Sequence, residues 1–188
     1  MSNPIDLTDE ELVELVRSQD QELYAELVKR YQAKLLRYAE SIVKSSDQAA
    51  DVVQQAFIKA FKNLNSFNTH KKFSSWIYRI VHNEAINLIK KHYKEHSLEG
   101  NEWPESILSD KNQPDLVEKI EQKEISAAMN QALDKLPIKY RTTLSLFFMD
   151  DKSYEEISDI LKIPIGTVGT RINRGKKILA HIYQQQEQ

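Results

Sequence analysis

Four basic side chains near the C-terminus have the type and spacing that point most directly to a ligand. Arg171, Arg174, Lys176 and Lys177 lie close together, and no acidic residue stands between positions 167 and 187. A guanidinium group can donate two hydrogen bonds to a guanine edge, whereas lysine ammonium groups mostly bind phosphate oxygens. The cluster therefore indicates a nucleic acid, and DNA first, as the ligand.

The residues around this cluster predict how it is presented. Ser153 and Glu156 have the spacing of a capping box, so a helix should begin there. Pro164 and Gly166 interrupt that helix, and a second, basic helix follows with Val168 on its apolar side. Two short helices across a tight turn form a helix-turn-helix whose second helix fits the major groove. The side chains predicted to contact DNA from this helix are Thr167, Thr170, Arg171, Arg174, Lys176 and Lys177.

A second group of candidate side chains occupies a polar loop predicted at 63–73 and the helix after it. Separating DNA strands requires aromatic surfaces on which bases stack and cations that bind the backbone. In a simpler interpretation, Phe67, Phe73 and Trp76 are core residues, and we expect Phe73 and Trp76 to be mostly structural. The candidates from the loop and the following helix are Asn65, Ser66, Phe67, Asn68, Lys71, Lys72, Trp76, Arg79, Asn83 and Lys90.

The helix predicted at 47–57 carries a polar face. Asp47, Asp51, Gln54 and Gln55 would offer carboxylate and amide groups to a basic partner helix. The pattern alone leaves a simpler alternative open, in which the helix is amphipathic and its acidic side chains only meet water.

Two histidines raise an alternative of the enzyme class. His92 and His96 are four residues apart, a spacing that can place two imidazoles on one helical face, as in a metallohydrolase. No convincing third ligand accompanies them, and no glycine-rich phosphate loop or nucleophile–base arrangement stands out. We therefore expect no metal site, no cofactor and no catalysis by this chain.

The composition limits the class of protein further. The chain has 188 residues, a formal net charge of −2 and no cysteine. Nucleic-acid binding must then come from local basic patches rather than from the overall charge, and the lack of cysteine fits a reducing compartment. The acidic N-terminus does not resemble a signal peptide, and no apolar run approaches membrane-spanning length. We expect a cytoplasmic protein with no membrane contact of its own.

Helical spacing of apolar residues predicts an all-α fold with two small helical domains. We expect the first domain at 1–96, a linker at 97–114 and the second domain at 115–188. The linker contains Gly100, Pro104 and Pro114, and the stretch 97–124 has eight acidic residues and three lysines. It should therefore be flexible and should repel DNA rather than bind it.

These features together resemble the extracytoplasmic-function class of the sigma-70 family of bacterial RNA polymerase sigma factors, over nearly the whole chain. Residues 47–57 look like the polymerase-binding helix of that family, and residues 67–83 like its strand-opening segment that reads the −10 element. Residues 136–141 look like the entry to the second domain, and the helix-turn-helix like the reader of the −35 element. The chain departs from the usual pattern at three positions. Gln55 stands where glutamate is more common, Asn87 where an acid is more common, and Gly169 where lysine or arginine is more common.

The resemblance implies an initiation factor rather than an enzyme. Its first domain, similar to sigma region 2, would bind core polymerase and open the −10 element, and its second, similar to sigma region 4, would bind the −35 element. The implied partners are core RNA polymerase, promoter DNA and a dedicated anti-sigma protein. The alternative is an autonomous helix-turn-helix regulator that binds duplex DNA without joining polymerase.

Overall fold

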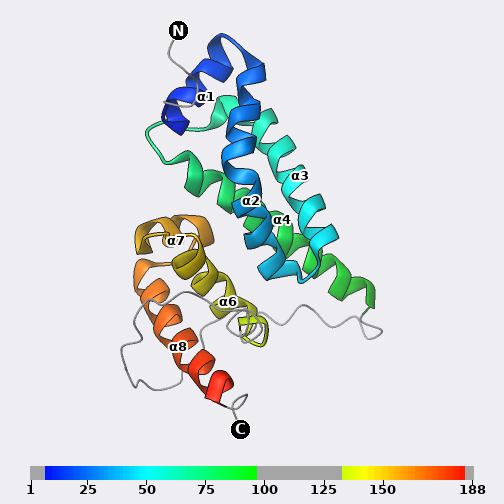
Figure 1. The fold of residues 1–188 in the computed structure, drawn as a ribbon, viewed down its shortest axis with the longest axis vertical. Helices are drawn as coiled ribbons and strands as arrows, with labels where there is room; N and C mark the ends of the chain where they lie inside the picture. The colour runs from blue at the N-terminus through cyan, green and yellow to red at the C-terminus, as the bar shows by residue number, and fades with distance from the viewer. Residues whose placement is uncertain (1–6, 97–132, 185–188) are drawn as a thin grey trace. The chain divides into compact units, whose positions relative to one another are not determined.

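The computed structural model describes residues 7–96 and 133–184, and every regular element in those two stretches is helical. The all-α prediction is therefore confirmed for this part of the chain. Contacts divide the chain into two compact units, Met1–Ile89 and Lys90–Gln188, with the division inside α4 (Figure 1). The predicted linker at 97–114 lies outside the described residues. The elements are α1 (Asp9–Ser18), η2 (Gln21–Leu23), α2 (Tyr24–Val43), α3 (Ser46–Lys62), η3 (Leu64–Ser66), α4 (Phe73–His96), α6 (Ile138–Leu144), η5 (Ser145–Met149), α7 (Tyr154–Leu161) and α8 (Ile165–Gln184).

Two capping boxes are present, the predicted one at Ser153 and another at Thr8. The Glu11 amide donates to Thr8 Oγ1 at 3.2 Å, and the Thr8 amide donates back to Glu11 Oε2 at 2.8 Å. At the start of α7, the Glu156 amide donates to Ser153 Oγ at 3.2 Å, and the Ser153 amide to Glu156 Oε2 at 3.0 Å. Each box satisfies backbone donors that have no partner inside the helix, and so fixes where the helix begins.

α3 begins at Ser46, one residue before the start of the helix predicted at 47–57. Lys44 ends α2 in the left-handed conformation, with φ of 59°, and Ser45 caps α3 by accepting from the Gln48 amide. Ser45 holds the extended backbone that a cap requires, so the helix begins before Asp47. Asp47 instead lies in the first turn, where a negative charge suits the positive end of the helix dipole.

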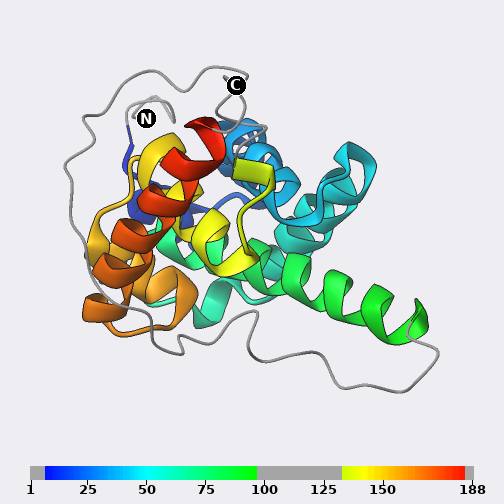
Figure 2. The same ribbon diagram turned by 90° about the horizontal axis from the view of Figure 1, so that it is seen from below.

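Aromatic side chains join α4 to α2 in the first unit. The rings of Tyr38 and Tyr78 lie 5.4 Å apart, and Tyr38 Oη is 2.9 Å from Nδ1 of His82. Nearer the start of α4, the Phe73 ring packs 5.6 Å from that of Tyr31. α2 and α3 pack along each other, as both views show (Figure 1, Figure 2). This packing holds the start of α4, and hence the loop before it, against the core.

The second unit packs α6 and α7 against α8. Lys162 ends α7 in the left-handed conformation, and α8 begins at Ile165 after the turn that contains Pro164, as the sequence predicts. Gly175 lies where α8 crosses α6. A methyl group there would come within 2.9 Å of Leu144 Cδ1 and 3.3 Å of Tyr140 Cβ. The close approach of the two helices therefore depends on glycine at this position.

Candidate functional site

The second helix of the helix-turn-helix, α8, turns a polar side to solvent. Thr170 and Asn173 are exposed, and Thr167, Arg174 and Lys177 are partly exposed. The Thr170 hydroxyl donates to the carbonyl oxygen of Gly166 at 3.0 Å, so its lone pairs are directed away from that bond. This side combines hydroxyl, amide and cationic groups, which are the groups that contact base edges and phosphates.

Two residues of α8 that the sequence predicts to contact DNA, Arg171 and Lys176, are placed differently from this polar side. Arg171 is only 7% exposed, because it follows the buried Val168 by three residues and so shares its inward side. A direct contact with a guanine edge does not fit this placement. The Lys176 ammonium lies 5.5 Å and 5.1 Å from the ring centroids of Phe147 and Phe148, a cation–π arrangement. A phosphate contact from Lys176 would require it to leave these rings.

Asn173 is a candidate that the sequence analysis missed. It lies three residues after Thr170 on the same helical side, and its amide can pair with both groups of an adenine edge. Its spacing from Thr170 is the signal in the sequence, although Asn173 has no charge and stands between Arg171 and Arg174.

The polar face of α3 lies where the sequence places it. All four predicted residues, Asp47, Asp51, Gln54 and Gln55, are exposed. Val53 and Phe57 are buried on the opposite side, so the polar face is held outward by the core. The face continues into an apolar side chain, Ile58, which is 40% exposed. That residue was missed because its type is typical of a core position.

The loop between α3 and α4 presents most of its predicted contacts to solvent. Asn65, Ser66, Asn68, Lys71 and Lys72 are exposed. Within the loop, the Ser66 hydroxyl donates to the Asn63 carbonyl at 2.8 Å, and Asn68 Oδ1 accepts from the His70 amide at 2.9 Å. These local hydrogen bonds, together with the short helix η3, give the loop a defined shape.

Phe67 is buried, so the idea that it offers a ring to an unstacked base needs correction. It is 6% exposed, and its ring lies 4.9 Å from Trp76 and 5.7 Å from Phe73. The simpler interpretation therefore holds for Phe67, which together with Phe73 fastens the loop to the core. Trp76 is half-buried and retains some exposed surface.

Two residues of α1 hold this loop at both ends, and the sequence analysis did not identify either. Arg17 Nε donates to the carbonyl oxygen of Leu64 at 3.0 Å, and Arg17 Nη2 donates to the carbonyl oxygens of Leu64 and Phe67. At the other end, Glu10 Oε1 accepts from the Phe73 amide at 2.7 Å. Hydrogen bonds to charged groups are stronger than neutral ones, so α1 fixes the loop more firmly than its own turns do.

The residues predicted on α4 lie along its outer side to different extents. Asn83 and Lys90 are exposed, whereas Arg79 is partly exposed. Nearby, Lys59 and Glu84 form an ion pair of 2.6 Å that joins α3 to α4. The helix therefore offers an amide and cations beyond the loop, at positions that one side of a helix can share.

Within residues 7–96 and 133–184, no three His, Asp or Glu side chains are grouped so that they could hold a metal ion. In the same stretches, no helix is long and apolar enough to cross a membrane. The side chain of His96, half of the predicted histidine pair, lies outside the described residues.

Comparison with known families identifies both units. Residues 27–95 match the family model described as sigma-70 region 2, and residues 121–179 match sigma-70, region 4. The chain is 36% identical over 174 residues to the ECF RNA polymerase sigma factor SigW of Bacillus subtilis, covering 89% of this chain and 92% of the relative. It is 35% identical over 185 residues to the ECF RNA polymerase sigma-E factor of Escherichia coli K12, covering 92% and 93%.

Solved structures agree on the fold. CnrH, in complex with the cytosolic domain of CnrY, aligns with a TM-score of 0.70 at 22% identity, covering 94% of this chain and 97% of that one. The sigma factor RpoE of Bartonella quintana, in complex with the anti-sigma factor NepR, aligns with a TM-score of 0.67 at 21% identity, covering 86% and 96%.

Proposed function

The chain belongs to the extracytoplasmic-function class of the sigma-70 family of RNA polymerase sigma factors, and we propose how its surfaces divide the work of initiation. As a sigma factor, it binds core RNA polymerase and directs transcription initiation at particular promoters. The matches to region 2 and region 4 cover both units, which favours this function over an autonomous helix-turn-helix regulator.

The exposed polar face of α3 carries the proposal. Asp47, Asp51, Gln54 and Gln55 are all exposed on a helix whose other side is buried, so they form a preformed surface. Carboxylates on such a surface attract a basic partner and set the register in which it docks. Ile58 adds apolar contact area at the end of the same face. We assign this face to core polymerase.

DNA is assigned to two further surfaces. The loop with Asn65, Ser66, Asn68, Lys71 and Lys72 would hold the opened −10 strand, together with Asn83 and Lys90 on α4. The outer side of α8 would bind the −35 element, with Thr170 and Asn173 at base edges and Arg174 and Lys177 at phosphates. This division follows from which side chains are exposed and from their chemistry.

The chain's part in initiation is to bind rather than to catalyse. Strand opening would use the free energy of base capture and of polymerase contacts. Work with polymerase on chromosomal DNA would place the protein in the cytoplasm. A dedicated anti-sigma protein is a further proposed partner, by analogy with the Bartonella quintana sigma factor, which was solved with one.

A charge reversal on α3 tests the polymerase assignment. Asp51→Arg with Gln54→Ala should lower the affinity for core polymerase at least tenfold, because it opposes a basic partner with a like charge. Affinity is measured by fluorescence, with circular dichroism to check the fold. Glu22→Arg with Gln32→Ala makes the same change in charge at exposed positions outside α3, on η2 and α2, and should bind normally. Equal affinity of both variants and the wild type would remove α3 from the interface.

A further inference from the structure

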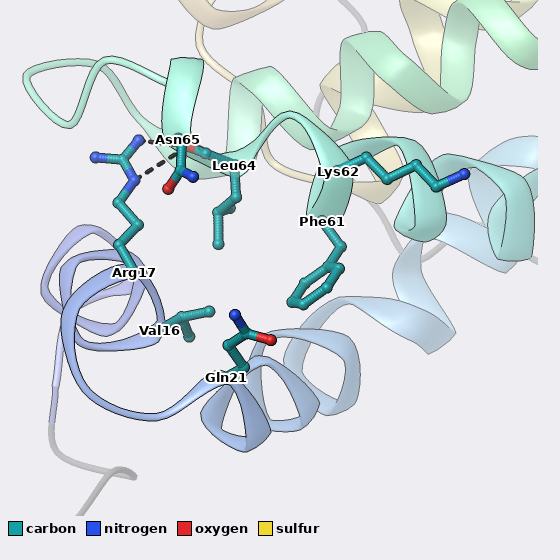
Figure 3. A pocket seen from close by; sticks show the side chains of 7 residues that line it. All are labelled: Val16, Arg17, Gln21, Phe61, Lys62, Leu64 and Asn65. Carbon is teal, nitrogen blue, oxygen red and sulfur yellow. Dashed lines mark hydrogen bonds between the residues drawn. The ribbon is translucent and has the colours of Figure 1, made fainter.

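Among the residues that the structure describes, the large apolar side chains exposed to solvent are Ile58, Phe61, Tyr93 and Ile165. Ile58 belongs to the α3 face, Phe61 lines a pocket in the first unit (Figure 3), and Tyr93 lies near the end of α4. Ile165 is the most exposed of these, at 48%, and it has no part in the surfaces assigned above. A single exposed isoleucine is common on protein surfaces, so what this one does depends on where it lies.

Ile165 is the first residue of α8, the second helix of the helix-turn-helix. Ile165, Gly169 and Asn173 follow one another at intervals of four residues, so they form one row along the helix. Asn173 is exposed and is assigned above to a base edge, and Thr170 lies beside this row. Ile165 therefore extends the side of α8 that is assigned to DNA, and it adds an apolar group to that side.

We propose that Ile165 contacts the C5-methyl group of a thymine in the −35 element and so helps to determine which promoters are recognised. The inference rests on the proposed function, because it requires α8 to lie in the major groove. The N-terminal residues of the second helix are those that reach base edges in a helix-turn-helix. Thymine presents a methyl group in that groove, and apolar side chains contact it.

Two glycines near Ile165 leave room for the DNA. A methyl group on Gly166 would meet no atom within 4 Å, and one on Gly169 would meet only Tyr154 Cε2, at 3.5 Å. Neither glycine has the left-handed backbone that would require it. Because packing and backbone do not explain these glycines, we assign them to the approach of a ligand. Without side chains here, the start of α8 can come close enough to a base pair for the isoleucine to reach it.

The turn before α8 holds Ile165 in place. The Ser158 hydroxyl of α7 donates to the Ile163 carbonyl oxygen at 2.6 Å, and the Ile163 amide donates to the Ser158 carbonyl oxygen at 3.3 Å. On the other side of Ile165, the Thr167 amide donates to the Pro164 carbonyl oxygen at 2.9 Å. The backbone on both sides of Ile165 is therefore fixed, which reduces the entropy lost when its side chain meets a base.

A thymine suits this position better than an apolar surface of a protein partner. Among the eight residues that follow Ile165, the exposed ones are Gly166, Thr170 and Asn173, so no apolar patch continues along α8. No acidic residue stands between positions 167 and 187, and the same helix carries the basic cluster. These cations attract the phosphate backbone, which brings the base pairs within reach of Ile165.

Thymine and deoxyuridine differ only by the methyl group, and this difference tests the proposal. A duplex is selected from a pool with a randomised −35 region by the full protein bound to core polymerase, and each −35 thymine is then replaced singly by deoxyuridine. At one thymine, the wild type should bind the deoxyuridine probe about fourfold more weakly, as loss of one buried methyl group implies. Ile165→Ala should bind the two probes equally, whereas Ile165→Val should retain the difference. Because Ile165 is exposed, both variants should fold.

The place of that thymine is a second expectation. Ile165 and Asn173 are eight residues apart, about 12 Å along the helix axis, which corresponds to roughly three base pairs of DNA. The thymine should therefore lie about three base pairs from the position at which Asn173→Ala relaxes the base preference.

The other results overturn the proposal. If the wild type binds every deoxyuridine probe as tightly as its thymine counterpart, Ile165 contacts no methyl group. If Ile165→Ala keeps the difference, another residue makes the contact. If Ile165→Ala also binds core polymerase more weakly, with that difference unchanged, the side chain faces a protein. The two probes are compared on one protein at a time, so their ratio does not depend on affinity for polymerase. Promoter-directed transcription by the wild type with core polymerase decides the proposed function separately.

Discussion

Two of the three glycines in α8, Gly169 and Gly175, have different surroundings. A methyl group on Gly169 would meet only Tyr154 Cε2, at an ordinary contact distance of 3.5 Å. A methyl group on Gly175 would meet Leu144 Cγ at 3.1 Å and Cδ1 at 2.9 Å, and Leu144 is fully buried. Gly169 is therefore dispensable for the fold, whereas Gly175 is required by it.

The two glycines should respond to alanine in opposite directions. Gly169→Ala should raise the free energy of unfolding by roughly 0.5–1 kcal/mol, because alanine favours the helix. Gly175→Ala should lower it by about 1–3 kcal/mol, since overpacking of Leu144 outweighs the same helical gain. Urea unfolding monitored by circular dichroism measures both. A stabilised Gly175→Ala protein would mean that α6 and α8 do not approach as closely as described.

On α8, different residues should contact base edges and bind phosphates. Asn173→Ala should relax the preference at one −35 base pair, at a cost of ~1–3 kcal/mol for the preferred base. Lys177→Ala should weaken every sequence alike and reduce the salt dependence by about one phosphate contact. Binding of the full protein to single-base promoter variants at several salt concentrations checks both. Uniform losses from Asn173→Ala would contradict its assignment to a base edge.

The sequence predicted which types of residue form the candidate surfaces more reliably than it predicted where their side chains point. The basic cluster on α8 was recognised, but Arg171 is buried, because the helical phase set by Val168 turns it inward. Phe67 was likewise a candidate to stack on a base, but in the folded chain its ring packs against Phe73 and Trp76. Charge and aromatic character are properties of one residue, whereas orientation depends on neighbours that only the folded chain brings together.

At the scale of elements, the helices themselves were largely predictable. The capping boxes at Thr8 and Ser153 are local signals, and both helices begin where those signals place them. The role of α1 was not predictable. Arg17 is 47 residues before Leu64 and 50 before Phe67, so no local spacing reveals that it holds their carbonyl oxygens.

The hold of α1 on the loop leads to a prediction for Arg17→Lys. An ammonium is a point charge and cannot reproduce the guanidinium fork that joins two carbonyl oxygens. The loop amides should become less protected, by roughly 1–2 kcal/mol, which means five- to thirtyfold faster hydrogen exchange. Promoter opening with core polymerase should slow, while closed-complex affinity changes little. Exchange mass spectrometry of residues 62–72 and permanganate footprinting are the measurements.

Glu14→Gln provides the matched control for that prediction. It removes the ion pair with Arg17 and leaves the hydrogen bonds from Arg17 to the loop in place. Because Glu14 is 55% exposed, this variant should exchange and open DNA like the wild type. If Arg17→Lys also behaves like the wild type, the loop holds its shape without α1.

At the scale of the whole molecule, charge is segregated rather than in excess. The net charge is only −2, yet cations gather on the outer side of α8 and in the loop, while α3 presents carboxylates and the apolar Ile58. A protein with surfaces for both polymerase and DNA would initiate whenever it is present, unless one surface is covered. If α3 binds polymerase as proposed, covering this face would be sufficient, because docking on polymerase would then precede strand opening.

We therefore predict a stoichiometric anti-sigma partner whose binding and that of core polymerase exclude each other. Purification of the protein from its native host without an inducing signal should recover this partner, and Asp51→Arg with Gln54→Ala should weaken the complex if both bind α3. The control variant Glu22→Arg with Gln32→Ala should retain it. Sequestration is wrong if the protein is always recovered free or bound to polymerase, and its promoters are transcribed at full level without any signal. Control would then have to act on the amount of protein, because no surface would be hidden.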